Sequence, residues 1–116
     1  MFSPAVSVPD ALWRDWRVSD RAKVLWCYLR TTGNTQLSFK QVRQSTGFAQ
    51  NSILKYLQEL SQSGWLDYRR SRHSFTFKTI WKRGRPAFRL PVDLICDREI
   101  PAAAKLIWGA ITRFQG

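Results

Sequence analysis

The sequence predicts a mainly helical α+β domain that carries a small β-hairpin. Two stretches place apolar residues at the spacing of one helix face, and two later stretches alternate apolar with polar residues as half-buried strands do. With 116 residues, of which 44% are hydrophobic, the chain is long enough for one compact domain and too short for two full ones. We therefore expect one main core.

The first long helix is predicted after a short extended lead at residues 6–9 and a helical turn at 11–16. Ser19 is suited to cap its start, and Gly33 and Asn34 are typical of a helix end. Its apolar residues recur at i, i+3, i+4 and i+7: Ala22, Leu25, Trp26 and Leu29. The opposite face should be exposed to water, with Arg21, Lys23 and Arg30.

Two further helices are predicted with a tight turn between them. Ser38 is a good N-cap for a short helix at 39–46, and Gly47 supplies the backbone freedom that the turn needs. The next helix, at 50–62, has one apolar stripe: Ile53, Tyr56, Leu57 and Leu60. Its opposite face carries Asn51, Lys55 and Gln58. Gly64 then stands where a left-handed residue would end the helix.

A β-hairpin is predicted after these helices. Residues 65–69 and 74–80 alternate aromatic or β-branched residues with polar ones, which is typical of strands. The segment between them, 70–73, is polar and basic. The hairpin should therefore present positive charge at its tip.

The chain is strongly basic, with a net charge of +11 from 19 basic and 8 acidic residues. Between Arg69 and Arg89 there are eight basic residues and no Asp or Glu. A small domain with this charge is suited to a polyanion, and the commonest such partner is the phosphate backbone of nucleic acid. Solubility or nonspecific adhesion is the alternative interpretation.

A weak internal repeat relates the start of the chain to its last part, with an offset of 82 residues. The matching residues are Val8-Pro9 with Leu90-Pro91, Leu12 with Leu94, Asp15 with Asp97, Val18 with Ile100, Ala22-Lys23 with Ala104-Lys105, Leu25-Trp26 with Ile107-Trp108, and Leu29 with Ile111. We accordingly divide the chain into a domain at 1–82, a basic linker at 83–89 and a helical segment at 90–116.

Two explanations of the repeat remain open. The chain could be the front of a longer protein with two domains of this kind in tandem, or the helix of the second copy could pack on the first domain or pair two subunits in a homodimer. An exposed helix of this composition would form an apolar patch, so we expect it to be covered.

The stretch from Thr46 to Leu60, closed by Ser63-Gly64-Trp65-Leu66, resembles the turn, recognition helix and start of the wing in winged helix-turn-helix DNA-binding domains. Together with Val8–Trp13 and Ser19–Leu29, it is similar over roughly residues 6 to 82 to domains of bacterial, phage and plasmid replication initiators and related regulators. The resemblance implies double-stranded DNA binding in replication initiation or transcription regulation. It also implies tandem winged helices, which similar initiators often carry.

Two residues depart from the pattern of that family. Ala49 stands where a Ser or Thr N-cap is common, which leaves the start of the recognition helix open. Tyr56 stands where a small residue is usual, which implies a roomier core or a hydroxyl that reaches the surface.

The recognition helix should enter the major groove with its first turn, where base edges present distinguishable donors and acceptors. The residues expected to contact bases are Gln50, Asn51, Ser52 and Lys55. The residues expected to contact phosphate from the preceding helix, the wing and the linker are Ser38, Lys40, Arg69, Arg70, Arg72, His73, Arg83 and Arg85. The alternatives are a solvated helix face, a solvated hairpin tip and, for Ser38, a plain N-cap, which is compatible with a phosphate contact.

Two further features allow more than one interpretation. Arg83-Gly84-Arg85-Pro86 resembles the core of the AT-hook, which lays arginines in a narrow minor groove, but a basic linker explains it equally well. The six tryptophans could stack on single-stranded nucleic acid. Most occupy apolar positions of the predicted elements, so core packing is expected, with Trp13 and Trp16 the least fixed.

No motif points to catalysis, a cofactor or a metal. There is no Gly-rich phosphate loop, and one histidine with two distant cysteines, Cys27 and Cys96, cannot supply the roughly four ligands of a zinc site. No run of about 18 apolar residues and no secretory signal is present. We expect a cytoplasmic, nucleoid-associated DNA-binding protein. The alternative is a protein-interaction winged-helix module in a larger nucleoprotein assembly, which would use Trp13, Trp16 and the second-copy helix as its docking face.

Overall fold

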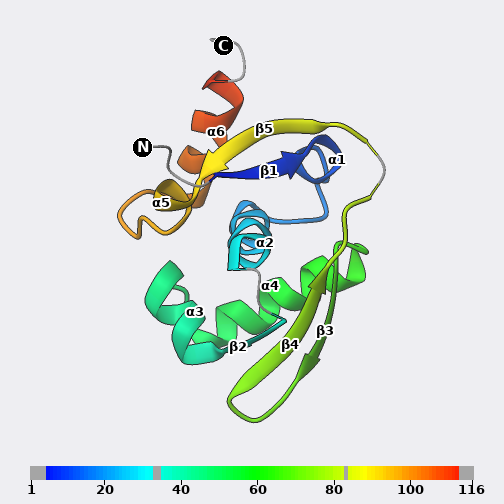
Figure 1. Ribbon diagram of the computed structural model, residues 1–116, viewed down its shortest axis with the longest axis vertical. Helices are drawn as coiled ribbons and strands as arrows, with labels where there is room; N and C mark the ends of the chain where they lie inside the picture. Colours follow the sequence, from blue (N-terminus) through cyan, green and yellow to red (C-terminus); the bar gives the residue numbers. More distant parts are fainter. Residues whose placement is uncertain (1–4, 33–34, 83, 113–116) are drawn as a thin grey trace.

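The chain folds around one helix, α2 (Asp20–Thr32), which lies between two antiparallel sheets (Figure 1). The computed structural model describes residues 5–32, 35–82 and 84–112, so the predicted helix end at Gly33 and Asn34 lies outside the described residues. Every residue of α2 from Ala22 to Leu29 is buried, because other elements cover the helix on both sides. The predicted α+β class is confirmed, with one main core.

One side of α2 is covered by the two predicted helices, the predicted hairpin and one further short strand, β2. They are β2 (Gln36–Ser38), α3 (Phe39–Thr46), α4 (Gln50–Gln62), β3 (Leu66–Arg70) and β4 (Ser74–Thr79). The strands form one antiparallel sheet in the order β2-β4-β3. The predicted bounds of both helices are confirmed, and the hairpin strands begin and end within one residue of the prediction.

The other side of α2 is covered by elements from both ends of the chain. They are β1 (Ala5–Pro9), α1 (Asp10–Trp13), β5 (Pro86–Pro91), α5 (Val92–Ile95) and α6 (Ala102–Thr112). β1 pairs with β5, and α6 packs on β5 and α2. The prediction that residues 86–89 form a basic linker is wrong, because Ala87 and Phe88 are buried and Phe88 and Arg89 pair with Val8 and Ser7 of β1.

Trp26 is at the centre of the packing between α2 and the hairpin. Its side chain is fully buried, and its indole N–H donates to the backbone carbonyl of Trp65 at 2.9 Å. The ring centroids of Trp65 and Trp81 lie 6.3 and 6.2 Å from that of Trp26. The predicted core packing is thus confirmed for Trp26 and Trp65, whereas Trp16 and Trp108 are exposed.

The helical pattern predicts that Lys23 is exposed to water, but Lys23 is buried. Its ammonium group donates to the Trp13 carbonyl at 3.0 Å and lies 5.8 Å from the centroid of the Trp13 ring. Loss of water lowers the pKa of Lys23, while Asp20 and Asp15 act in the opposite direction. The prediction is wrong because β1, β5 and α6 form a layer that covers this face of α2.

One cap and two glycines fix the ends of α3 and α4. Ser38 caps α3 as predicted: its hydroxyl accepts from the Gln41 N–H, and the Gln41 side chain accepts from the Ser38 N–H. Gly47 after α3 and Gly64 after α4 have φ angles of 79° and 81°, in the left-handed region. Ala49 makes no side-chain hydrogen bond, so it leaves the N–H groups of the first turn of α4 uncapped.

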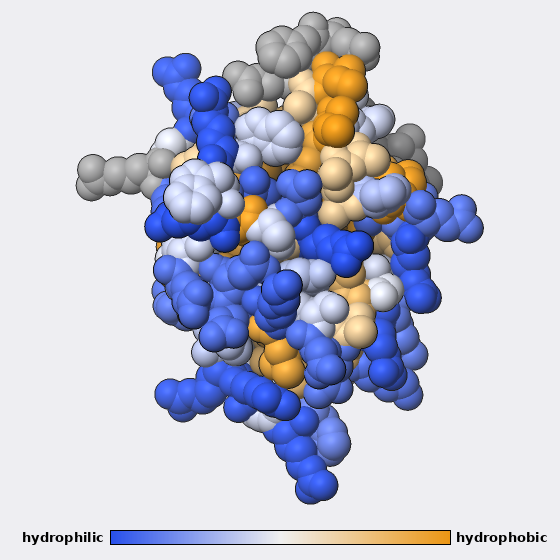
Figure 2. Space-filling view, turned by 180° about the vertical axis from the view of Figure 1, so that it is seen from behind, coloured by the Kyte–Doolittle hydropathy of each residue, from blue (hydrophilic) through white to orange (hydrophobic). Residues whose placement is uncertain are grey.

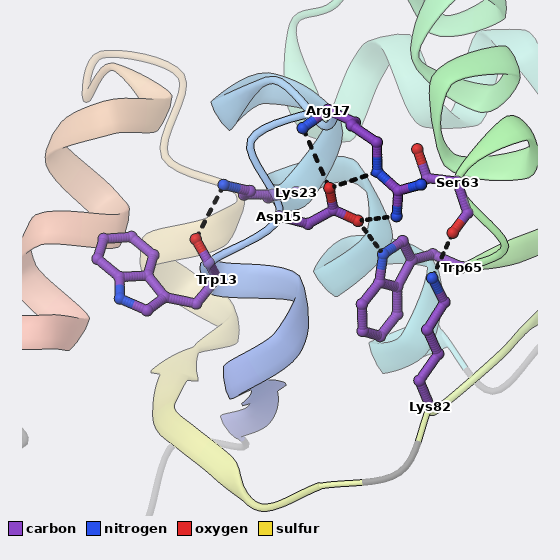
Figure 3. A network of polar contacts seen from close by, with 7 residues as sticks. All are labelled: Trp13, Asp15, Arg17, Lys23, Ser63, Trp65 and Lys82. Atoms are coloured by element: carbon purple, nitrogen blue, oxygen red, sulfur yellow. Dashed lines mark hydrogen bonds and ion pairs between the residues drawn. The ribbon is translucent and has the colours of Figure 1, made fainter.

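Asp15 ties the loop after α1 to the segment after α4 (Figure 3). Its carboxylate accepts hydrogen bonds at 3.0 Å from the backbone and guanidinium of Arg17 and from the indole N–H of Trp65. The side-chain hydrogen bond from Arg17 is the largest cause that holds the pKa of Asp15 well below its usual range. Burial acts in the opposite direction, and the Trp65 bond lowers the pKa further. Nearby, Lys82 donates to the Ser63 carbonyl.

We expect Asp15 to make the fold sensitive to acid. A carboxyl group whose pKa is depressed in the folded state stabilises the fold above its ordinary pKa of 3.8, and this contribution is lost as the pH falls from there through the lower folded pKa. Thermal unfolding of wild type and Asp15→Asn over a pH series measures it. The difference in Tm should be largest at neutral pH and should narrow below about pH 4. A difference that stays constant with pH would show that the charge of Asp15 contributes nothing.

Candidate nucleic-acid interface

The tip of the hairpin lies against the start of α3. β2 pairs with β4 so that Ser38 lies opposite Ser74. The Phe39 N–H donates to the His73 carbonyl at 3.1 Å, and the Ser71 N–H closes the tip on the Ser74 carbonyl at 2.8 Å. These bonds hold the tip, residues 71–73, beside the first turn of α3.

A cavity of about 390 Å³ opens where the hairpin tip meets the first residues of α3 and α4; we call it the wing cavity. It brings four predicted contact residues together with two others: Ser38, Lys40, Gln50 and His73 with Phe39 and Arg43. The Ser38 hydroxyl is bonded to Gln41 as an N-cap, and Lys40 and Arg43 supply the positive charge that would hold an anion in this cavity. Sequence reasoning missed Arg43, although it lies three residues after Lys40 and so on the same side of α3.

A second cavity of about 360 Å³ lies on the other side of the first turn of α4; we call it the turn cavity. Ser52, a predicted contact residue, lines it together with Arg21 and Arg98. Arg98 comes from the loop between α5 and α6 and lies over Gly47, where its Nε would be 2.7 Å from an added Cβ. No pattern in the sequence near α4 indicates Arg98, because only the fold brings this loop to the α3–α4 turn.

Tyr56 forms the inner wall of the turn cavity. Its side chain is buried, and its ring packs edge-on against Phe48 with centroids 5.3 Å apart. A side-chain hydrogen bond with Tyr56 raises the pKa of Arg21. Of the two alternatives for this large residue, the structure thus favours a ring in the core with its hydroxyl at the surface.

Other predicted residues on α4 and the hairpin lie outside the two cavities. The exposed ones are Asn51, Lys55, Arg70 and Arg72. Arg69 is also exposed, but it lies opposite Thr76 and lines a different hollow, together with Asp67 and Lys78. We therefore regard Arg69 as the least favourably placed of the predicted wing contacts.

The residues of the AT-hook-like segment do not join either cavity. Arg85 is exposed beside α1, where its carbonyl accepts the Asp10 N–H at 3.0 Å. Pro86 already belongs to β5. Arg83 lies outside the described residues.

Neither a metal centre nor a reactive thiol is found in the described part of the chain. Within residues 5–32, 35–82 and 84–112, no group of three or more His, Cys, Asp or Glu could hold a metal ion, and no helix is long and apolar enough to cross a membrane. Burial raises the pKa of the Cys27 thiol to about 12 and also raises that of Cys96.

No family model, curated protein or solved structure matches this chain. The chemistry of its own residues must therefore indicate what it does. In that respect the first turn of α4 is distinctive, because it lies between two cavities that both carry arginine side chains.

Proposed function

We propose that this chain is a winged helix-turn-helix protein that binds a specific site on double-stranded DNA. In this proposal α4 is the recognition helix, the β3–β4 hairpin is the wing, and the protein works in the cytoplasm in association with the nucleoid. The observation that carries the proposal is the position of the first turn of α4 between the wing cavity and the turn cavity.

The order and pairing of the elements support the winged-helix part of the proposal. α2, β2, α3, α4, β3 and β4 follow one another in the chain, and their strands form one antiparallel sheet. α3 and α4 are joined by residues 47–49 with a left-handed glycine. Two helices joined by a short glycine-containing turn, with a hairpin beside them, are the parts that a helix-turn-helix with a wing requires.

The side chains of the first turn of α4 support contact with bases. A helix fits the major groove, and residues near its N-terminus reach deepest. Gln50 and Asn51 carry amides that can make two hydrogen bonds to adenine, and a good bidentate pair contributes about 1–3 kcal/mol of discrimination. Lys55, one turn further along α4, is exposed and suited to a phosphate or a guanine edge.

The charges on both sides of α4 support contact with the DNA backbone. Lys40 and Arg43 lie on the wing side, and Arg21 and Arg98 lie on the other side. The described residues that line the two cavities include no Asp or Glu. Cations on both sides of a helix in the groove can each neutralise a flanking phosphate, which provides affinity and sets the orientation of the helix.

Two biological uses fit this activity, replication initiation and transcription regulation on a bacterial chromosome, plasmid or phage. The binding chemistry is the same in both, so the location of the binding sites decides between them. Repeated sites at an origin would favour initiation, and an operator in a promoter would favour regulation.

A protein-interaction module in a larger nucleoprotein assembly is the second candidate function. The exposure of Trp16 and of three apolar residues on α6 favours it. Reversing the charges at Arg70 and Arg72 would leave protein docking through these residues intact, whereas it would abolish DNA binding.

Fluorescence anisotropy with a labelled random-sequence duplex over a salt series tests DNA binding. We expect tight binding at low salt that weakens steeply as salt rises. Lys55→Ala and Arg72→Ala should each weaken binding about three- to tenfold and lower the slope of log K against log salt by about 1 per lost phosphate contact.

Arg14→Ala is the matched control. It removes the same charge from a side chain that is 71% exposed beside α1, and it should change neither the affinity nor the slope appreciably. Absence of duplex binding at low salt would contradict the proposal and favour the docking function. Equal affinity for the matching single strand would contradict groove reading by α4.

A further inference from the structure

The turn cavity contains more than the two arginines that contact with DNA would use. Lys105 of α6 also lines it, and its wall includes the apolar side chains of Phe48, Ile100 and Pro101. Its volume of about 360 Å³ lies in the usual range of small-molecule pockets, about 300–1,000 Å³. A single phosphate of a DNA backbone would therefore leave part of this cavity empty, including its apolar wall.

Two guanidinium groups from different elements meet at the cavity. Figure 1 shows the loop between α5 and α6 beside the end of α3, and Arg98 of this loop lies over Gly47. Arg21, at the start of α2, makes a side-chain hydrogen bond with Tyr56. Among the described residues neither arginine forms an ion pair with a carboxylate. Both charges are therefore available to a ligand.

Lys105 brings a buried ammonium group to the same cavity. Only 4% of the residue is exposed, and its ammonium group donates to the Ile95 carbonyl at 2.7 Å. Within residues 5–32, 35–82 and 84–112 it makes no second hydrogen bond, although an ammonium group has further donors. Lys23, its counterpart in the repeat, also lies beside the Trp13 ring, and the second copy has Ile95 in place of that ring. Lys105 thus has unused donors for a ligand in the cavity.

The chemistry around the cavity favours an anion. The described residues that line it include no Asp or Glu. Loss of water lowers the pKa of Lys105, while Asp97 and Cys96 act in the opposite direction. Ser52 lines the cavity from the first turn of α4, whose N–H groups Ala49 leaves uncapped. Guanidinium, ammonium and backbone N–H donors together match a phosphate group, which has several acceptor oxygens.

The exposed apolar residues of α6 belong to a different surface. Ile107, Trp108 and Ile111 are exposed and do not line the cavity. Figure 2 shows hydrophobic residues at the surface at the end of the molecule that carries α6. α6 contributes Ala102 and Lys105 to the cavity from its first turn instead. A ligand in the turn cavity would therefore leave the apolar surface of α6 uncovered.

We propose that the turn cavity is a binding site for a small organic phosphate monoester. Arg21, Arg98 and Lys105 would bind its phosphate group. Its organic body would lie against Phe48 and Ile100. A monoester carries a charge of about −1.5 to −2 at neutral pH, whereas each phosphate of a DNA backbone carries about −1. The three cations that line the cavity therefore favour the monoester over the backbone.

Such a ligand would compete with DNA, and this consequence rests on the proposed function. Arg21 and Arg98 are the cations that the proposed DNA complex uses on this side of α4, so a ligand that occupies them removes contacts to the backbone. Because coupling between two ligands is reciprocal, DNA would weaken binding of the ligand by the same factor. Binding of the ligand to the protein alone does not depend on DNA.

Isothermal titration calorimetry with phenyl phosphate tests the site on the protein alone. We expect phenyl phosphate to bind several-fold more tightly than inorganic phosphate, which lacks the organic body, and than methyl phenyl phosphate, which is a diester with a single charge. Absence of binding at millimolar phenyl phosphate would overturn the proposal. Equal affinity for the diester would also overturn it and assign the cavity to the DNA backbone, and equal affinity for inorganic phosphate would overturn the organic ligand.

Arg98→Ala should weaken binding of phenyl phosphate about tenfold, because it removes a charged hydrogen-bond donor. Arg43→Ala is the matched control: it removes the same charge from the wing cavity, on the other side of α4, and should leave the affinity for phenyl phosphate unchanged. Both side chains are exposed, so both variants should fold as the wild type does, which circular dichroism checks. An equal loss of affinity in the two variants would overturn the proposal, because it would show attraction to the net charge alone.

Fluorescence anisotropy with the labelled duplex separates this proposal from the proposed function. At constant ionic strength, saturating phenyl phosphate should weaken duplex binding several-fold. Binding of phenyl phosphate by a chain that binds no duplex would support the cavity site and overturn the proposed function. Duplex binding by a chain that binds no phosphate monoester would overturn the cavity site and leave the proposed function in place.

Discussion

Trp26→Ala should lower the free energy of unfolding by about 3–5 kcal/mol. The indole is fully buried, its ring contacts those of Trp65 and Trp81, and its N–H is bonded to the Trp65 carbonyl. Truncation would leave a large cavity between α2 and the hairpin, and the Trp65 carbonyl would keep only the Ile80 N–H of its two donors. Urea unfolding followed by circular dichroism measures the change.

Trp108→Ala is the natural control, because the repeat places the same residue at the same position of α6. Its side chain is 43% exposed, so we expect a loss of about 1 kcal/mol or less. Losses of similar size in the two variants would contradict the difference in burial between α2 and α6. A small loss for Trp26→Ala would contradict its place at the centre of the core.

Gly109→Val should lower the free energy of unfolding by about 1–3 kcal/mol and loosen α6 from β5. A Cβ at Gly109 would lie 2.4 Å from the Phe88 ring and 3.0 Å from Leu90. The Phe88 ring has little room to move, because it is buried and meets the edge of Trp13 with centroids 5.3 Å apart. Urea unfolding gives the free energy, and hydrogen exchange with mass spectrometry should show faster exchange in α6.

Ala103→Val controls for the helix propensity of valine. Ala103 is exposed on the same helix, so the substitution should cost only about 0.5 kcal/mol and should not change the exchange of α6 more than slightly. Identical behaviour of the two variants would mean that the close approach at Gly109 does not hold α6 on β5.

The elements that depend on local sequence signals could be predicted almost to the residue. α3 and α4 have the predicted bounds, because a serine cap and glycines at their ends are written next to them in the chain. The hairpin followed from alternation over a few residues. In each case the interactions that define the element connect residues close in sequence.

What could not be predicted depends on the pairing of β1 with β5. Nothing in the alternation of residues 6–9 says which strand they will join, and the basic side chains around residues 86–89 favoured a linker over a strand. The burial of Lys23 follows from the same pairing, since the layer that β5 and α6 form covers its side of α2.

The candidate site likewise contains residues that local sequence signals could predict and one residue that they could not. Lys40, Gln50 and His73 could be named in advance, because each lies at the start of a predicted helix or at the predicted hairpin tip, and the fold places them in one cavity. Arg98 could not, because it is distant from α4 in sequence and reaches the turn at Gly47 only in the folded chain. A cationic residue on an irregular loop has no periodic pattern that could indicate its neighbours.

The shared strand pair also constrains how this chain can be divided. Among the described residues β1 pairs only with β5, which follows the helices and the hairpin in the chain. Excision of either copy would therefore leave an open strand edge, together with the buried apolar side chains of Val6 and Val8 or of Phe88 and Leu90. Because a strand of one copy pairs with a strand of the other, no single cut in the chain separates the two copies without breaking the β1–β5 sheet.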